Sequence, residues 1–402
     1  LYHVSHDIKT ALKKTLLPDS SMFESMGFSY MGPVDGHDVE ALTQSLQWAR
    51  EQRCPVLLHV RTVKGKGYSP AEERPADYHG VSPFDPVTGK PLRTAKMDFS
   101  HVFGQELTAL AGEDGRVCAI TAAMQEGTGL TEFARKYPDR LFDVGIAEGH
   151  AVSMAGGMAK QGLVPVFAVY SSFLQRGYDQ LLQDVALDGL HVVLGVDRAG
   201  LVGADGETHH GCFDALYLSQ VPHMTVLCPA SFAELRQMLR RAVLELTGPV
   251  AVRYPRGGEG AYQDCCGNET FTQVRPGADC TILTYGVLIN EALAAAELLH
   301  EAGVETRVVK LNAIAPLDGN AVLAALGSEK RLLVLEDCVG SGCVGQRLTA
   351  ILAQRGRMPE RLILKNLGDT IPCHGTVPQL YAQCGLDAAS VAAALKEACH
   401  EQ

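Results

Sequence analysis

The residues best able to do chemistry lie in the middle of the chain, where apolar runs end in polar side chains. Glu148 interrupts the stretch FDVGIAEGHAVSMAGGMA (142–159), between a strand-like run and a run of small residues. A carboxylate placed between a strand and a helix either stabilises the helix N-terminus or contacts a ligand. Taken alone, these residues favour the first interpretation and leave the second open.

A glycine-rich loop, AGLVGADGETHHGCFD (199–214), offers a second group of polar side chains. Asp205 and His209 are four residues apart, so they could share one face of a short helical turn. Asp205 would then orient His209, whose imidazole titrates near neutral pH and can move protons. The alternative is a flexible, solvated loop without a catalytic role.

Three further side chains follow strand-like runs and could bind an anion. Tyr170 follows VPVFAV, Arg198 follows HVVLGVD, and Arg256 ends VAVRYPR. The planar guanidinium group forms charge-assisted pairs with phosphate oxygens, which suits a phosphorylated ligand. For each arginine taken singly, a surface ion pair is the alternative.

The first third of the chain contains weaker candidates. Lys64 lies among glycines in VKGKGY (63–68), and His79 lies in DYHGVSPFD (77–85). A lysine beside glycine-rich turns often meets phosphates, but the signal is weak without companions. The stretch GPVDGHD (32–38) predicts a turn before a helix that begins near Asp38.

Strand-like and helix-like runs alternate through most of the chain, which predicts an α/β fold with doubly wound parallel sheets. We expect three blocks, at 1–95, 96–270 and 275–402. The first block ends in a Pro-, Gly- and charge-rich loop (65–93), and the third block is expected to serve packing or dimerisation. Ligands of doubly wound sheets bind at the carboxyl ends of the strands. In the second block those ends carry Glu148, Tyr170, Asp197, Arg198 and Arg256.

Composition excludes several classes of function. The net charge of -11 and the lack of a dense Lys/Arg run argue against nucleic acid as a partner. No apolar run approaches the roughly 18 residues of a membrane span. The 12 cysteines lack the paired spacing of a zinc site, and GSGCVG (340–345) lacks the full spacing of a dinucleotide loop. We therefore expect a cytoplasmic protein with reduced thiols.

Several stretches together resemble the 1-deoxy-D-xylulose-5-phosphate synthase family, thiamine-diphosphate enzymes of the transketolase superfamily. The stretches are GPVDGHD, VKGKGYSPAE, YHGVSPFD, AMQEGTGL, DVGIAEGHAV, YSSFLQRGYDQ, DRAGLVGADGETHHGCFD and VRYPRG. They occur in the family's order through nearly the whole chain. The resemblance implies that block 96–270 is the pyrimidine-binding domain and block 275–402 the transketolase C-terminal domain. Block 1–95 would be the end of the diphosphate-binding domain with a linker.

The resemblance also implies a cofactor site. The residue matching Glu148 hydrogen-bonds N1′ of the aminopyrimidine of thiamine diphosphate and so helps to remove a proton from thiazolium C2. A buried carboxylate in an apolar setting suits this exchange. Phe173 would stack on the pyrimidine ring, Ile146 and Met124 would line the cofactor, and Lys64 would approach it.

The reaction implied by the resemblance joins pyruvate to D-glyceraldehyde 3-phosphate and releases CO2. The product, 1-deoxy-D-xylulose 5-phosphate, begins the non-mevalonate isoprenoid pathway. His209 and His79 would move protons at the two carbonyl groups, and Asp205 would contact substrate. The acceptor phosphate would be held by three side chains: Tyr170, Arg198 and Arg256.

Two departures from the family pattern affect these expectations. Gly149 stands where the family usually has Gln, beside Glu148. No stretch matches the family's GDG motif with its later Asn, which holds Mg2+ and the diphosphate; GEDGRV (112–117) precedes a strand instead of following one. We therefore expect no metal ligand in this chain, and a Mg2+ site in a missing N-terminal portion that was trimmed or is supplied by another chain.

Other identities remain open. The alternatives are a 2-oxo acid dehydrogenase β subunit, transketolase itself, or an inactive fragment. Residues 1–95 and the pair Arg198 and Arg256 argue against the β subunit. The chain begins at Leu1 without Met, so we expect the natural protein to start earlier. The resemblance implies a homodimer.

Overall fold

The computed structural model describes residues 21–75, 77–81, 83–92, 96–267, 269–327 and 329–400. The chain forms two compact units, Leu1–Ala95 and Lys96–Gln402. Each unit has its own hydrogen-bonded sheets, so each is described by itself. Within the described residues, no helix is long and apolar enough to cross a membrane.

The first unit contains a parallel β-α-β arrangement. Strands β1 (Ser29–Asp35) and β2 (Val56–Arg61) pair in parallel, and helix α3 (Val39–Glu51) connects them. Asp38 caps α3 by accepting a hydrogen bond from the backbone of Ala41, as expected for a helix that begins there. The prediction of a turn over the whole of GPVDGHD was wrong, because residues 32–35 belong to β1 and only 36–37 turn.

The segment expected to be an irregular loop (65–93) contains helix α4 (Ser69–Glu73). A proline in its first turn, Pro70, suits a helix start because it has no N–H to leave unpaired. The rings of Tyr68, Tyr78 and Phe84 then pack together, with centroids 5.4 to 6.0 Å apart. This aromatic cluster gives order to a proline-rich segment that lacks a repeating apolar pattern.

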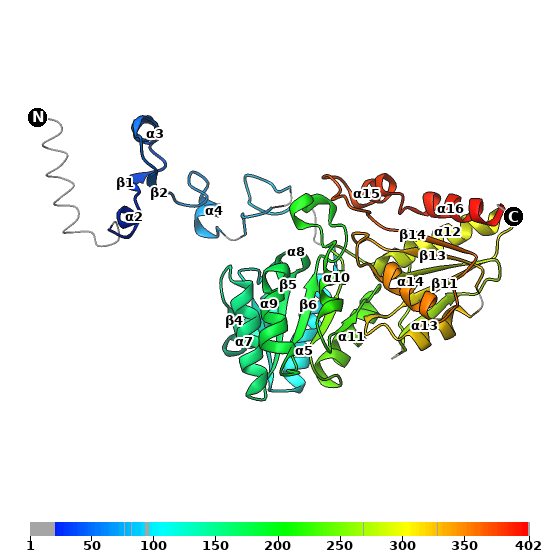
Figure 1. Cartoon of the computed structure of the whole chain (residues 1–402). Helices are drawn as coiled ribbons and strands as arrows, with labels where there is room; N and C mark the ends of the chain where they lie inside the picture. The colour runs from blue at the N-terminus through cyan, green and yellow to red at the C-terminus, as the bar shows by residue number, and fades with distance from the viewer. Residues whose placement is uncertain are drawn as a thin grey trace, which may run out of the picture. The chain divides into compact units, whose positions relative to one another are not determined.

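The second unit contains a seven-stranded sheet in the order β12-β7-β8-β6-β5-β3-β4. Its strands are β3 (Val117–Thr121), β4 (Leu141–Asp143), β5 (Val164–Tyr170), β6 (Val193–Asp197), β7 (Thr225–Leu227), β8 (Val250–Arg253) and β12 (Ala313–Ala315). Figure 1 labels three of these strands, β4, β5 and β6. All are parallel except β12. Every residue of β3, β5 and β6 is buried, because helices cover both faces of the sheet.

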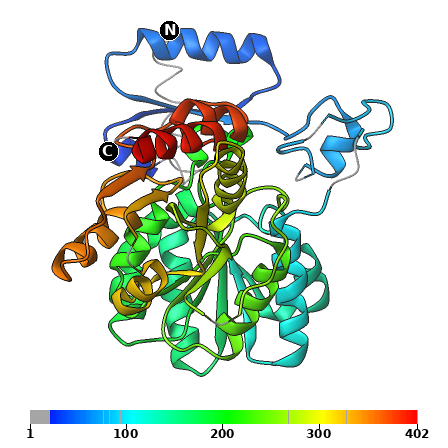
Figure 2. The same cartoon turned by 90° about the vertical axis from the view of Figure 1, so that its right-hand side faces the viewer.

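Those helices divide between the two faces (Figure 2). Helices α5 (Phe99–Glu113), α6 (Thr131–Lys136) and α11 (Phe232–Leu244) share one hydrophobic core, and α7 (Glu148–Lys160) and α10 (Asp214–Gln220) share the other. Successive strand residues serve the two cores in turn, as Val166 and Phe167 do. The sheet is therefore doubly wound, as predicted.

Helix α7 packs closely on the segment after β5. A Cβ atom at Gly156 would lie 2.5 Å from the carbonyl oxygen of Asp184, so glycine permits the approach. The segment 171–186 is not one continuous helix but a series of short helical turns: α8 (Ser171–Leu174), α9 (Tyr178–Gln180) and a wide π-helical turn (Leu181–Ala186). Gly177 lies against α7, where a Cβ atom would be 2.9 Å from Val152. The break accommodates this close packing.

A five-stranded sheet follows, in the order β14-β13-β10-β11-β9. Its strands are β9 (Phe271–Arg275), β10 (Cys280–Tyr285), β11 (Thr306–Leu311), β13 (Arg331–Leu335) and β14 (Arg361–Lys365). The helices are α12 (Ile289–Glu301), α13 (Gly319–Leu326), α14 (Val344–Gln354), α15 (Val377–Cys384) and α16 (Ala388–His400). The sequence did not predict the antiparallel edge strands β9 and β12, because a short edge strand lacks the apolar run of a central strand.

The two sheets of the second unit share one core. Leu194 and Val196 of β6 belong to the same hydrophobic cluster as Leu283, Val309 and Val334 of the five-stranded sheet. A salt bridge between Lys310 and Glu234 also joins the two parts, with 3.0 Å between Nζ and Oε2 and no exposure of either side chain. The C-terminal part is therefore packed firmly against the sheet that carries the predicted site.

Candidate active site

Most predicted site residues lie at the carboxyl edge of the seven-stranded sheet. Tyr170 ends β5, Arg198 directly follows β6, and Arg256 follows β8 by three residues. Parallel strands bring these ends to one edge, where they contact the loop Arg198–Gly211, here called the 198–211 loop.

Asp205 connects the two arginines. Its Oδ2 atom lies 3.1 Å from Nε of Arg198 and 3.0 Å from Nε of Arg256. Arg198 has a positive φ of 61° and also donates to the Gly127 carbonyl at 3.2 Å. Its guanidinium carbon lies 3.7 Å from the centroid of the Tyr170 ring. Only 14% of the Arg198 side chain is exposed, so this arginine is not part of a surface ion pair.

The predicted pairing of Asp205 with His209 was wrong. Gly206, at φ 80°, separates two short 3-10 turns, so residues 205 and 209 do not share a helical face. The carboxylate instead faces the two guanidinium groups, whose charge attracts it more strongly than a neutral imidazole would. Nδ1 of His209 lies 2.9 Å from the hydroxyl of Thr208.

Aromatic side chains hold the ring of His209. Tyr170 and Phe173 stack with centroids 5.3 Å apart, and His209 meets Phe173 edge-on at 5.2 Å. Burial raises the pKa of the Tyr170 hydroxyl to about 12, so the phenol stays protonated at neutral pH. Gly127 leaves room for this hydroxyl, because a Cβ atom there would collide with it. Tyr170, Phe173, Arg198 and His209 therefore form one continuous group.

Asp197 pairs with Arg198; the sequence placed it at a strand end beside Arg198 but assigned it no role of its own. It is fully buried, accepts a 2.6 Å hydrogen bond from the hydroxyl of Ser100, and lies 3.2 Å from Nη1 of Arg198. Burial raises the pKa of its carboxyl group to about 6. Its position at the end of β6 was the available signal, shared with many strand ends that have no role.

Glu148 is the first residue of α7 and is 3% exposed. The expected apolar setting was wrong, because Nη1 of Arg176 lies 3.3 and 3.2 Å from its two carboxylate oxygens. Arg176 is 28 residues away in a broken helical segment, and no sequence signal pointed to this pair. No side chain caps α7 by a hydrogen bond, so Glu148 contributes only its charge to the helix N-terminus.

Three apolar side chains were predicted to line the cofactor, and one of them, Ile146, is close to Glu148 in the chain. Ile146 is 78% exposed although it is large and apolar, and Met124 and Phe173 are half-buried. A carboxylate close in sequence to an exposed isoleucine, together with an aromatic side chain on the same sheet edge, fits a ring that has both polar nitrogens and apolar faces. The chemistry of these donors therefore fits the aminopyrimidine end of thiamine diphosphate.

Lys64 and His79 belong to the first unit, where they contact each other. Nζ of Lys64 donates a hydrogen bond of 2.7 Å to Nδ1 of His79. The ammonium group can only donate, so a neutral His79 carries its ring proton on Nε2. This contact favours that tautomer of His79 and leaves its Nε2–H free to donate a hydrogen bond.

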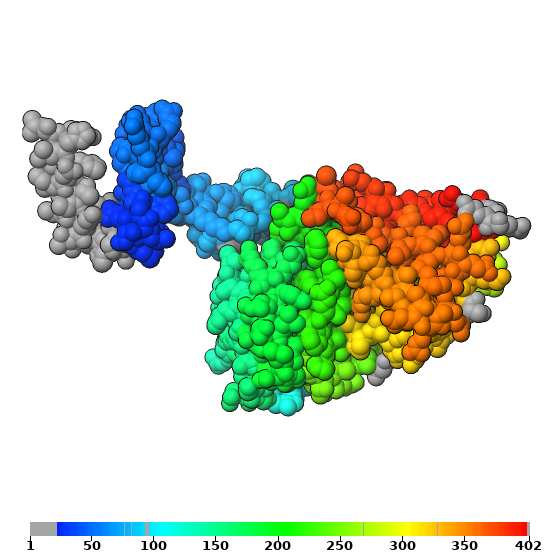
Figure 3. All heavy atoms as spheres, viewed as in Figure 1, coloured from blue at the N-terminus to red at the C-terminus, as the bar shows by residue number. Residues whose placement is uncertain are grey.

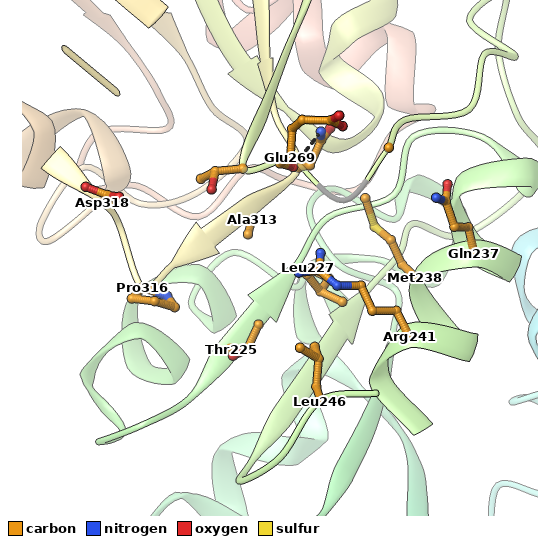
Figure 4. Close-up of a pocket in the computed structure, with 13 residues that line it drawn as sticks. Thr225, Leu227, Gln237, Met238, Arg241, Leu246, Glu269, Ala313, Pro316 and Asp318 are labelled. Carbon is orange, nitrogen blue, oxygen red and sulfur yellow. Dashed lines mark hydrogen bonds between the residues drawn. The ribbon is translucent and has the colours of Figure 1, made fainter. Parts of the chain in front are cut away.

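Two other features carry no part of this site. No group of three or more His, Cys, Asp or Glu side chains within the described ranges could hold a metal ion. A cavity of about 320 Å³ lies beside β7, α11 and β12, with Arg241, Glu269 and Asp318 in its wall (Figure 4). None of the predicted site residues lines this cavity. The carboxyl edge of the sheet, in contrast, brings together two arginines, a carboxylate and a histidine.

Three family models match the chain. The model for the transketolase pyrimidine binding domain matches residues 95–258, the transketolase C-terminal domain matches 270–391, and the model named 1-deoxy-D-xylulose-5-phosphate synthase matches 1–62. Together these models cover most of the chain, in the order expected from the sequence.

Curated relatives named 1-deoxy-D-xylulose-5-phosphate synthase are similar to nearly all of the chain. The relative from Desulforudis audaxviator is 44% identical over 94% of this chain, and the one from Syntrophotalea carbinolica is 43% identical over 100%. The chain spans 60% and 64% of the length of these two relatives.

Solved structures show the same fold. A split-gene transketolase, described as an inactive beta4 tetramer, matches with a TM-score of 0.66 and 25% identity, over 74% of this chain and 97% of that one. A transketolase from Pichia stipitis in complex with sedoheptulose-7-phosphate matches with a TM-score of 0.63 and 14% identity, over 76% of this chain and 46% of that one. The solved structures thus show the transketolase fold, and the sequence comparisons show that the chain belongs to the 1-deoxy-D-xylulose-5-phosphate synthase family.

Proposed function

We propose that this protein is a transketolase-type transferase that condenses pyruvate with D-glyceraldehyde 3-phosphate, forming 1-deoxy-D-xylulose 5-phosphate and CO2 with thiamine diphosphate as cofactor. The observation that carries the proposal is the pair Arg198 and Arg256 joined by Asp205 beside His209. Family membership supports it, although the chain spans about three fifths of its curated relatives.

The arginine pair provides the site for the acceptor phosphate. Two guanidinium groups that share one carboxylate keep several N–H donors for an incoming anion, since each guanidinium has five. The protonated hydroxyl of Tyr170 adds a neutral donor on the same edge. Asp205 keeps the two positive charges close together before the phosphate binds, and it contacts the substrate.

Histidines move the protons of the reaction. His209 rests on the edge of Phe173 with its Nδ1 beside Thr208, which leaves Nε2 directed to the substrate as an acid or base. Lys64 favours one tautomer of His79, and resemblance assigns His79 the second carbonyl. Resemblance likewise assigns Lys64 to the cofactor.

Glu148 serves the aminopyrimidine end of the cofactor. When bound, thiamine diphosphate supplies the electron sink that permits loss of CO2 and attack on an aldehyde. The carboxyl group of Glu148 would hydrogen-bond N1′ and exchange a proton there, and Arg176 holds this carboxyl group in place. Phe173 faces the ring, and Ile146 and Met124 provide apolar contacts. Mg2+ binding, a homodimeric state and a cytoplasmic location are further parts of the proposal, and they rest on family resemblance.

The test is a product assay. The purified protein is incubated with pyruvate, glyceraldehyde 3-phosphate, thiamine diphosphate and Mg2+, and the 1-deoxy-ketose phosphate is measured by mass spectrometry. We expect this product, and we expect none from the Glu148→Gln variant. No product, together with turnover of a xylulose phosphate donor, would point to transketolase. Transfer to a lipoyl acceptor would point to a 2-oxo acid dehydrogenase subunit.

A further inference from the structure

The C-terminal part of the second unit touches the 198–211 loop along its length. At the start of the loop, Gly200 has a φ of 78° and lies so close to Asp337 that a Cβ atom would collide with the carboxylate. Just beyond its end, the backbone N–H of Val339 donates a 3.1 Å hydrogen bond to the carbonyl of Cys212. Both ends of the loop are thus anchored on the segment after β13.

The middle of the loop is covered by the segment Pro372–Val377, which leads into α15. Nε2 of His374 donates a 3.1 Å hydrogen bond to the carbonyl of Ala204. A Cβ atom at Gly203 would lie 3.1 Å from both the carbonyl oxygen of Gly375 and the amide nitrogen of Val377. Figure 3 shows the orange-red surface of this part of the chain meeting the green surface.

His210, inside the 198–211 loop, also lies against the segment Pro372–Val377. Nδ1 of buried His210 accepts a 3.2 Å hydrogen bond from the backbone of Val202, which ties the two sides of the loop together. The backbone of Pro372 and Cys373 interacts with the same ring, although its Nε2 atom has no well-aligned hydrogen bond among the described residues. The segment Pro372–Val377 therefore packs on His210, whose hydrogen bond to Val202 joins the two sides of the loop.

From these contacts we propose that the C-terminal domain positions the acceptor site, and that His374 is a positioning residue for Asp205. Ala204 is the neighbour of Asp205, so a hydrogen bond that holds the Ala204 carbonyl also orients the carboxylate that joins Arg198 and Arg256. His374 touches neither arginine in this chain of contacts and acts only through the loop. The role rests on the proposed function, because it concerns binding of the phosphorylated acceptor.

The test compares His374→Ala with His374→Gln, whose amide nitrogen can replace the Nε2 donor. The matched control is His300→Ala, which removes a histidine on α12 of the same domain; His300 pairs with Glu305, away from the loop. Two readouts are used: hydrogen exchange of peptides covering 203–211, and KM for glyceraldehyde 3-phosphate and for pyruvate.

We expect His374→Ala to speed exchange of the loop amides, such as that of Gly206, which donates to Gly203. The acceptor KM should rise about three- to tenfold, as for loss of one hydrogen bond, while kcat and the KM for pyruvate stay within about twofold. His374→Gln should restore most of both values, and His300→Ala should resemble the unchanged protein.

Several outcomes would overturn the inference. They are unchanged loop exchange in His374→Ala, an equal rise in both KM values, or no rescue by glutamine. Hydrogen exchange needs no turnover, so the two proposals separate. Faster loop exchange in a protein without synthase activity would contradict the proposed function and leave the positioning of the loop standing.

Discussion

The two sheets of the second unit place polar residues at the same kind of edge and use them in opposite ways. At the carboxyl edge of the seven-stranded sheet, Arg256 remains 40% exposed and His209 is half-buried. At the corresponding edge of the five-stranded sheet, Tyr285, Glu336 and Asp337 are each at most 5% exposed. A strand end therefore becomes a binding site only where other groups leave it uncovered.

At the edge of the five-stranded sheet, here called the closed edge, the protein's own groups bind the carboxylate of Glu336. The carboxylate of Glu336 accepts hydrogen bonds from the backbone of Val344 at 2.9 Å and Gly345 at 2.8 Å, at the start of α14, and from the Tyr285 hydroxyl at 3.1 Å. This is where the glycine-rich stretch GSGCVG lies. The N–H groups that could have met a phosphate instead bind the protein's own carboxylate.

The largest expected effect is at the carboxyl edge of the seven-stranded sheet, here called the open edge. Glu148→Gln should lower kcat by about 10²- to 10⁴-fold, because the amide cannot exchange a proton with the cofactor. The melting temperature should stay within about 3 °C, since glutamine can still pair with Arg176. Steady-state kinetics and thermal denaturation measure the two values. A variant that keeps more than about a tenth of the original kcat would contradict the role of Glu148.

The next effect concerns Arg253, the last residue of β8 in the seven-stranded sheet, which faces Asp337 of the closed edge. Arg253 is 4% exposed and binds Asp214 at 2.8 and 3.1 Å, with Asp337 at 4.0 Å. Arg253→Met should lower the free energy of unfolding by about 3 to 5 kcal/mol, because two buried carboxylates lose their counter-charge. Urea denaturation measures the change. The control, Arg116→Met, breaks an exposed pair with Asp114 and should cost less than about 1 kcal/mol.

A smaller effect depends on pH. The carboxyl of Asp197 has its pKa raised to about 6 by burial, from about 3.9 in an unfolded chain. Between these values the folded state holds more protons than the unfolded state, so this group lowers stability as the pH rises from about 4 to 6. Asp197→Asn should remove up to about 3 kcal/mol of that decline. Denaturation of both proteins across this range measures it, and parallel stability curves would refute the assignment.

The smallest effect tests the exposed side of the open edge. Arg256→Ala should raise the KM for glyceraldehyde 3-phosphate about tenfold, roughly 1.4 kcal/mol, because a half-exposed charge is screened by water. The KM for pyruvate should not change. Arg256→Lys keeps the positive charge but lacks the planar guanidinium group, so its KM for glyceraldehyde 3-phosphate should lie between those of the unchanged protein and Arg256→Ala. An equal rise in both KM values would mean that Arg256 does not hold the acceptor phosphate.

Position along the strands was predictable because it depends on local pattern. Alternating apolar runs identified β5 and β6, and geometry then requires Tyr170 and Arg198 to meet at one edge. The partners of these residues were not predictable. Asp205 faces two arginines instead of His209, because a positive φ at Gly206 ends the turn between them. The spacing of four residues between Asp205 and His209 does not tell whether the carboxylate pairs with the histidine or with the arginines.

The sequence by itself determined the α/β class, the family and the positions of Tyr170, Arg198 and Arg256 after strands, since all three follow from residue types and their order. Only the tertiary structure decided that Arg176 holds Glu148, that Asp197 supports Arg198 and that His374 reaches Ala204. The last contact joins residues 170 positions apart. Such contacts depend on how the two sheets pack through a shared core, and no local pattern of residues encodes that packing.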